Sequence, residues 1–234
     1  MQLSSYPHLT RAEFDHSIAC FAERYAHALQ HRYGQSVHVA TAPRGPLAAG
    51  AQRYLCIGGD ILAAAADPAE APCMDAAIED ADPAAPRLPA PATAIGCGGR
   101  VEYHVAYSPT WRVPQLLVRV SEQLADGSLA PVFSVARALE LLRVDAAVRG
   151  ALAAVEFGGA LSVADHPVLG VPWLAVHPCQ TAGLLATVGA VGADDYVAAW
   201  ASLVGCAVGL ALPAVRPRGE AEGGAATAHE QRRG

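Results

Sequence analysis

Two amino acids are missing from this chain of 234 residues, which contains no lysine and no asparagine. Its basic residues are therefore all arginine, 16 against 22 acidic residues, and the formal net charge is −6. The arginines form no cluster, so the dense positive charge that binds phosphate is absent, which argues against a nucleic-acid partner. We attribute both absences to a composition dominated by Ala, Gly and Arg, but one consequence holds whatever the cause. No side chain of this chain offers an amine for acylation.

Paired cysteines and a secretory signal are missing as well. The six cysteines are widely scattered and none forms a C-x-x-C pair: Cys20, Cys56, Cys73, Cys97, Cys179 and Cys206. This argues against a zinc site or a disulfide framework, and we expect neither a metal nor an organic cofactor. Residues 1–10 lack a basic region followed by an apolar run, so we expect a cytoplasmic protein with reduced thiols. Any covalent chemistry would fall to a single cysteine.

One run without charges, residues 197–215, is long enough on paper to cross a bilayer. It is rich in Ala and Gly, which contribute little transfer free energy, and Pro213 lies inside it. We therefore expect a buried helix that enters a short core strand, without stable membrane insertion.

A helical pattern covers residues 10–33. Its apolar side chains recur at steps of three or four and form one stripe: Phe14, Ile18, Phe21, Tyr25 and Leu29. Thr10 and Glu13 match a capping box, and Gly34 follows the last turn as a stop signal. These features predict a helix that packs by one face.

Strands follow this helix. Residues 54–57 predict a strand that ends in a turn at 58–60, and residues 101–108 alternate between two faces. Residues 115–120 form the returning strand of an antiparallel hairpin, with Pro114 at its entrance. Two later segments, 134–143 and 194–204, have helical patterns. The order of helix, antiparallel strands and helices predicts an α+β fold.

Seven of the 22 acidic residues and no arginine lie between Asp60 and Asp82, in a tract of Ala and Pro that extends to about residue 96. Few of its side chains are large enough to offset the entropy of ordering, so we expect a flexible insertion at about 60–96. Docking of a basic partner is the alternative role for this tract. We expect one domain over residues 1–213 and a disordered tail over 214–234.

The segment that suggests chemistry surrounds Cys179. An apolar run, residues 173–176, leads to His177 and Pro178, and Pro178 interrupts the strand so that Cys179 begins a loop. A following helical turn at 181–187 would place the positive end of its dipole near the sulfur, which favours a thiolate. From chemistry alone, a buried apolar thiol is the favoured interpretation of Cys179.

Three blocks in order resemble one family. They are the sequence His-Pro-Cys-Gln-Thr with its upstream Asp-His-Pro-Val-Leu-Gly-Val-Pro-Trp, the run from Tyr196 to Pro213, and the hairpin segments that begin at Val101 and Val113. Together these blocks cover about half of the chain. They are similar to the autophagy-related E2-like conjugating enzymes of the autophagy protein ten family.

The resemblance implies a ubiquitin-conjugating-enzyme-like fold, with an N-terminal helix packed on an antiparallel sheet, a loop bearing the catalytic cysteine, and a C-terminal helix. It implies that Cys179 accepts the C-terminal glycine of the modifier, autophagy protein twelve, from the E1-like autophagy protein seven. Cys179 would then pass this glycine to a lysine of autophagy protein five. A thioester is an activated acyl group, so such an enzyme needs chiefly to position donor and acceptor. We expect the hairpin 101–120 to offer an edge strand to the acceptor protein.

General E2 enzymes use an asparagine to stabilise the oxyanion or organise the site, and this chain has none. The role would fall to backbone N–H groups, to a side chain, or to a bound partner. The candidate side chains are Tyr103, Tyr107, Gln180 and Thr181. His177 could act as a base, but we favour a hydrogen bond that shapes the loop. Gln180 stands where the family often has lysine.

Three alternatives stay open. A sister E2-like enzyme of the autophagy protein three type also carries His-Pro-Cys and transfers its modifier to phosphatidylethanolamine. A thiol hydrolase would pair Cys179 with a distant histidine such as His104 or His166. A non-enzymatic adaptor would resemble the family without forming an adduct.

Overall fold

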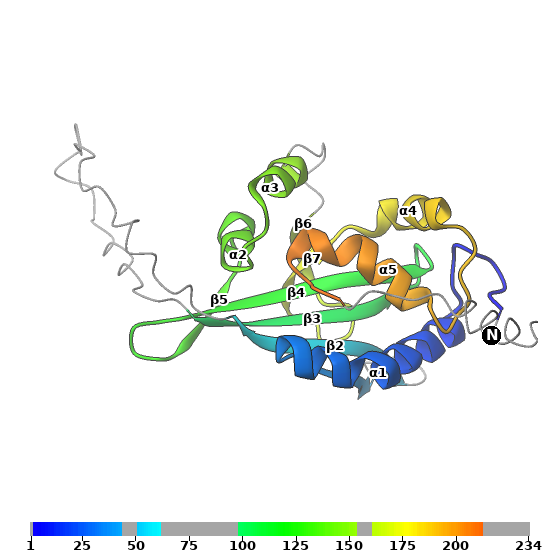
Figure 1. Cartoon of the computed structure of the whole chain (residues 1–234), viewed down its shortest axis with the longest axis horizontal. Coiled ribbons are helices and arrows are strands. Elements are labelled where there is room, and N and C mark those ends of the chain that lie inside the picture. The colour runs from blue at the N-terminus through cyan, green and yellow to red at the C-terminus, as the bar shows by residue number, and fades with distance from the viewer. Residues whose placement is uncertain (1, 44–50, 62–97, 154–160, 213–234) are drawn as a thin grey trace, which may run out of the picture.

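A computed structural model of the chain describes residues 2–43, 51–61, 98–153 and 161–212 (Figure 1). The elements, in chain order, are α1 (Arg11–Tyr33), β1 (Ser36–Pro43), β2 (Ala51–Ile61), β3 (Gly99–Ser108), β4 (Val113–Gln123), β5 (Leu129–Val132), α2 (Val135–Leu141), α3 (Ala146–Ala153), β6 (Leu161–Asp165), β7 (Pro172–Val176), the 3₁₀ turn η1 (Pro178–Gln180), α4 (Thr181–Val188), α5 (Tyr196–Val204) and the 3₁₀ turn η2 (Gly205–Val208). The expected flexible insertion, beyond residue 61, and the expected tail 214–234 lie outside the described residues. The N-terminal helix, the antiparallel sheet and the C-terminal helices confirm the α+β fold.

The strands of the described residues form one antiparallel sheet of seven strands. Their order is β1-β2-β3-β4-β7-β6, and β5 also pairs with β4. The hairpin β3–β4 lies in the middle of this sheet, with Tyr103 opposite Val118 and Val105 opposite Leu116. Strand β7 pairs with β4 through Leu174 opposite Val118, so it lies beside the central hairpin although it comes much later in the chain.

Helix α1 begins where its local sequence predicts. The Glu13 N–H donates to Thr10 Oγ1 at 3.2 Å, and the Thr10 and Ser4 N–H groups donate to the Glu13 carboxylate at 2.7 Å each. Burial would raise the pKa of Glu13, but hydrogen bonds from Thr10 and Ser4 outweigh it and lower the pKa to about 2. Gly34 ends the helix with a φ of 65°, and its N–H donates to the Gln30 carbonyl. The predicted capping box and glycine stop are both confirmed.

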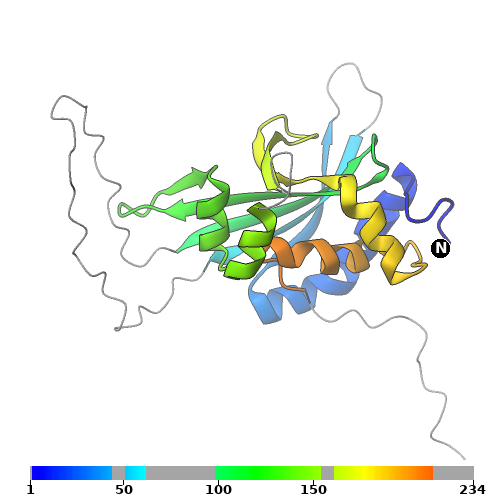
Figure 2. The ribbon, with the colours of Figure 1, turned by 90° about the horizontal axis from the view of Figure 1, so that it is seen from above.

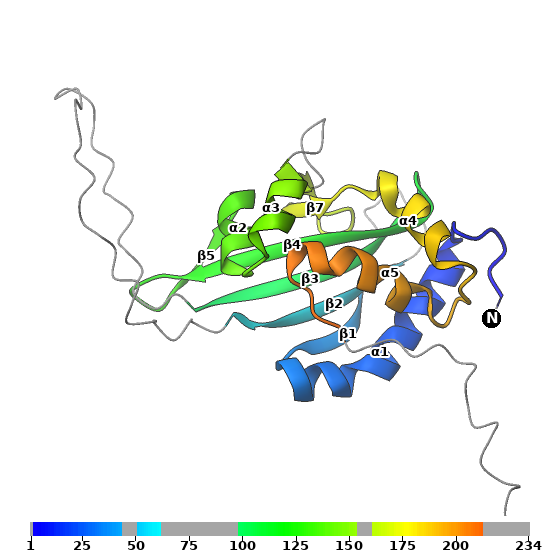
Figure 3. The same cartoon turned by 45° about the horizontal axis from the view of Figure 1, so that its top comes forward.

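The sheet carries a hydrophobic cluster on each face. The larger cluster joins one face of the central strands to α1, α2, α4 and α5. Figures 1 and 3 show α1 and α5 on this same side of the sheet, and the view from above in Figure 2 shows them side by side. Val101, Tyr103 and Val105 point to this cluster. The smaller cluster lies on the opposite face, where Ala106 and the ring of His104 pack near Trp173.

Two expectations about the sheet need correction. Strand β2 does not turn at residues 58–60 but continues through them to Ile61, because Gly58 and Gly59 keep their pairing with Glu102 and Val101. The hairpin is not an edge, because β2 flanks β3 while β7 and β5 pair with β4. Strands β1, β5 and β6 and helix α3 were not among the expected elements.

The uncharged C-terminal run also differs from expectation. Helix α5 begins at Tyr196 and ends at Val204, and η2 follows it, so the described residues show no core strand here. Tyr196 and Trp200 are buried, as their spacing predicts. Among the described residues, no helix combines the length and the apolar character needed to span a bilayer.

Candidate active site

Strand β7 delivers Cys179 to the surface from the middle of the sheet. Trp173, Leu174 and Ala175 are buried, and Ala175 pairs with Leu117 of β4. Three residues after the strand ends, Cys179 is an exposed free thiol within η1. A buried, doubly paired strand thus gives this surface sulfur a rigid support.

His177 and Pro178 set the shape of the loop. His177 has extended backbone dihedrals and caps η1, because its ring atom Nδ1 accepts a hydrogen bond from the Cys179 N–H at 3.2 Å. Pro178 is buried and occupies the first position of η1, where a missing N–H costs nothing. The Thr181 N–H donates to the Pro178 carbonyl and closes the turn, after which α4 begins. In this geometry the imidazole faces the backbone N–H of Cys179.

Trp111, which no sequence pattern singled out, also lies at this site. It lies in the turn between β3 and β4, its ring centroid is 5.8 Å from that of His177, and it is 44% exposed. The turn itself is anchored, because the Arg112 N–H donates to the Ser108 carbonyl and the Leu9 N–H donates to the Arg112 carbonyl. An aromatic side chain in a turn that needs no core residue is the one sequence signal that could have pointed to it.

The two tyrosines proposed for the oxyanion role point elsewhere. The Tyr103 hydroxyl is in the core and donates to the Val208 carbonyl at 3.0 Å. The Tyr107 hydroxyl donates to the Leu9 carbonyl at 2.8 Å. Each hydroxyl has one proton, and each proton is used to join the sheet to another element. Gln180, the residue that follows Cys179, is exposed, whereas Thr181 is buried.

The histidines of the hydrolase alternative form a buried pair instead. His104 Nδ1 and His166 Nε2 are 3.0 Å apart, and His166 Nδ1 accepts hydrogen bonds from the N–H groups of Val168 and Leu169. Both rings pack against Trp173 in the smaller cluster. Burial lowers the pKa of His104 to about 3 and that of His166 to about 4. With both ring nitrogens of His166 occupied, this pair gives no support to a Cys–His hydrolase.

The other described cysteines are less suited to act as a nucleophile. Cys56 is buried in β2, and desolvation raises the pKa of its thiol to about 12, which suppresses nucleophilicity. Cys20 is partly buried on α1. Cys206 is exposed, but it follows α5 and its thiol donates to the Leu203 carbonyl. Cys73 and Cys97 lie outside the described residues.

Comparisons with known proteins identify relatives. The family model described as "Autophagocytosis associated protein, active-site domain" matches residues 8–215. A protein of Gibberella zeae named "Ubiquitin-like-conjugating enzyme ATG10" is 34% identical over 113 residues, which cover 48% of this chain and 46% of that protein. A protein of Homo sapiens with the same name is 31% identical over 122 residues, which cover 49% of this chain and 50% of that protein. The chain thus spans about half the length of the curated relatives that it matches.

A solved structure described as "Crystal structure of Autophagic E2, Atg10" is also similar, with a TM-score of 0.30 and 22% identity over 45% of this chain and 61% of that chain. This likeness is too slight to carry an argument. The family model, by contrast, spans most of the chain and includes both the sheet and the Cys179 loop. The resemblance found in the sequence is therefore confirmed: the chain belongs to the autophagocytosis-associated protein family defined by this active-site domain.

Proposed function

We propose that this chain is an E2-like conjugating enzyme of autophagy that carries a ubiquitin-like modifier as a thioester on Cys179. The observation that supports it most directly is the exposed Cys179 thiol, which a buried strand presents on a capped 3₁₀ turn inside the matched family domain. The names of the relatives, ubiquitin-like-conjugating enzymes, agree with this chemistry.

The reaction has two acyl transfers. In the first, the Cys179 thiolate attacks the thioester carbonyl of the E1-bound modifier, a new C–S bond forms, and the E1 cysteine leaves as a thiolate. In the second, a neutral lysine amine of the acceptor attacks the same carbonyl, the amide bond forms, and the Cys179 sulfur leaves while the amine loses a proton. In its finer form, the proposal takes autophagy protein seven as the E1, autophagy protein twelve as the modifier and autophagy protein five as the acceptor.

Residues of the chain hold the Cys179 sulfur in position and stabilise the charge that develops during the transfer. His177 orders the turn that exposes Cys179, and Trp111 forms an apolar wall beside His177. Since the Tyr103 and Tyr107 hydroxyls are used elsewhere and Thr181 is buried, the exposed side-chain amide of Gln180 and the backbone N–H groups of the loop are the remaining candidate donors for the developing oxyanion.

An adduct assay tests the proposal. The chain is incubated with the E1, the modifier and ATP, and the products are separated with and without thiol reductant. We expect a reductant-sensitive adduct for the unmodified chain and a reductant-resistant, hydroxide-sensitive oxyester for Cys179→Ser. Because the chain has no lysine, a resistant bond cannot be an amide to one of its own side chains.

Cys206→Ser is the matched control, since Cys206 is the other described cysteine that is exposed. It should still form the reductant-sensitive adduct. Absence of any adduct from the unmodified chain would favour the adaptor alternative. A reductant-resistant oxyester formed only by Cys206→Ser would instead assign the thioester to Cys206. Transfer to phosphatidylethanolamine vesicles, without transfer to autophagy protein five, would favour the autophagy protein three type.

A further inference from the structure

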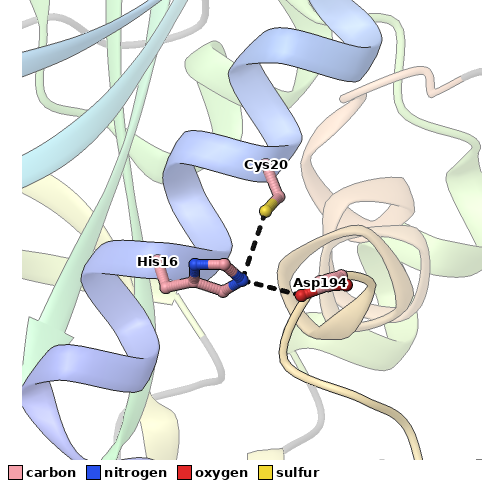
Figure 4. A group of neighbouring side chains, drawn as sticks. All are labelled: His16, Cys20 and Asp194. Atoms are coloured by element: carbon pink, nitrogen blue, oxygen red, sulfur yellow. Dashed lines mark hydrogen bonds and ion pairs between the residues drawn. The ribbon is translucent and has the colours of Figure 1, made fainter. Parts of the chain in front are cut away.

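Three side chains that ligate metals converge where α1 meets the turn before α5 (Figure 4). His16 Nε2 lies 2.7 Å from Asp194 Oδ1 and 3.4 Å from Cys20 Sγ. All three ligand atoms lie within 4.8 Å of one another. Within the part of the chain that the structure describes, this is the only such group of three. None of these residues belongs to the Cys179 site.

The convergence is built into rigid elements. His16 and Cys20 are four residues apart on α1, so they occupy one face of the helix. The chain that follows Asp194 is held against the same helix at two points. The Val197 N–H donates to the fully buried Ser17 hydroxyl at 3.0 Å, and Asp195 forms an ion pair with Arg24. These contacts fix where Asp194 lies relative to His16, independently of any ion.

The donor atoms determine which cation fits. One imidazole nitrogen, one sulfur and one carboxylate oxygen suit Zn²⁺, whereas Ca²⁺ and Mg²⁺ prefer oxygen alone. Tetrahedral bonds of about 2.0 to 2.3 Å place ligand atoms roughly 3.2 to 3.7 Å apart. The N–S distance of 3.4 Å already lies in this range, and the N–O distance of 2.7 Å would have to open by roughly half an ångström.

The hydrogen-bonding chemistry of His16 leads to the same conclusion. Nε2 has a single in-plane direction for a proton or a lone pair, yet an oxygen and a sulfur both approach it. A metal ion in place of the Nε2 proton would bind the nitrogen, the oxygen and the sulfur together.

We propose that His16, Cys20 and Asp194 bind one Zn²⁺ ion, with water as the fourth ligand, and that this ion ties α1 to the start of α5. The cysteine spacing of the sequence excludes only sites built from C-x-x-C pairs. Here a single cysteine, Cys20, joins a histidine and an aspartate, and the aspartate lies 178 residues after the histidine in the sequence. Binding requires a thiolate and a neutral imidazole, so the affinity rises with pH.

Metal titration of the reduced full chain tests the site. We expect one equivalent of Zn²⁺ to bind in competition with a chromophoric chelator and to raise the melting temperature. Co²⁺ as a spectroscopic substitute should show a thiolate-to-metal charge-transfer band. His16→Ala and Cys20→Ala should each weaken Zn²⁺ binding by more than about tenfold, because even loss of an outer-shell partner costs that much. Cys20→Ala should also abolish the Co²⁺ band.

Two controls separate this site from adventitious binding. Cys206→Ala removes an exposed thiol, and His27→Ala breaks the stacked His27–His31 pair, which has the same i,i+4 spacing on α1. Both variants should bind Zn²⁺ and Co²⁺ like the unmodified chain. No binding by the unmodified chain, equal affinity in Cys20→Ala, or a Co²⁺ band that disappears only in Cys179→Ala would each overturn the proposal.

Discussion

At the scale of single residues, the histidine two positions before the proposed nucleophile acts through the backbone. His177 Nδ1 accepts the Cys179 N–H, so its lone pair is already used to hold the turn. A base in the transfer reaction would need that lone pair for a proton. The geometry therefore makes His177 a positioning residue of the Cys179 loop.

Substitutions at His177 distinguish the two roles. His177→Ala removes the acceptor, and loss of a cap costs about 1 kcal/mol, so we expect roughly fivefold slower formation of the Cys179 adduct. His177→Asn keeps a side-chain oxygen that can accept the same N–H, and it should form the adduct within about twofold of the normal rate. Adduct formation under single-turnover conditions, followed across pH, is the measurement. If both variants lost the same fraction of the rate, and the pH dependence of the rate changed, His177 would instead be assigned the proton transfer.

At the scale of elements, α1 carries both the local signals of its own ends and the contacts that place the C-terminal helix. Its capping box satisfies the first N–H groups of the helix, and the hydrophobic stripe behind it packs on the sheet. The hairpin β3–β4 has the opposite character. Its alternation is clear in the sequence, but its neighbours β2 and β7 come from distant segments.

Loss of the cap should weaken the whole domain through α1. Thr10→Ala removes the acceptor for the Glu13 N–H and one donor to the Glu13 carboxylate, so the free energy of unfolding should fall by about 1 kcal/mol. Thr10→Ser retains the hydroxyl and should recover most of that loss. Urea unfolding followed by circular dichroism gives both values. Equal stability of Thr10→Ala and the unmodified chain would show that Glu13 and Ser4 alone suffice to hold this end.

At the scale of the whole molecule, the sheet carries a hydrophobic cluster on each face, and the smaller cluster buries a pair of imidazoles. His104 and His166 have folded-state pKa values of about 3 and about 4, below their ordinary value of 6.5. The unfolded chain therefore binds more protons than the folded chain below pH 6.5. Above that pH, burial of the two neutral imidazoles does not lower the free energy of unfolding. As the pH falls from 6.5 toward 4, the unfolded chain takes up protons that the folded chain does not, and the free energy of unfolding decreases.

The free energy of unfolding should accordingly decrease by about 2 kcal/mol for each of the two imidazoles between pH 7 and pH 5. Urea midpoints at the two pH values measure this change. His104→Gln cannot take up the proton and should show a smaller change, while His27→Gln, on the exposed side of α1, should behave like the unmodified chain. A midpoint that stays the same at pH 5 would contradict the burial of the pair in neutral form.

What the sequence by itself determined about this protein is local. The ends and the buried face of α1, the β3–β4 hairpin, and the turn that presents Cys179 follow from caps, periodicity and proline within a few residues of each feature. Tertiary structure decided whatever joins distant segments. The central place of the hairpin, the position of Trp111 beside His177, the His104–His166 pair and the meeting of His16 with Asp194 link parts of the chain that are far apart in sequence. Strand order and side-chain proximity across such distances depend on how all the elements pack together, and no local pattern encodes that.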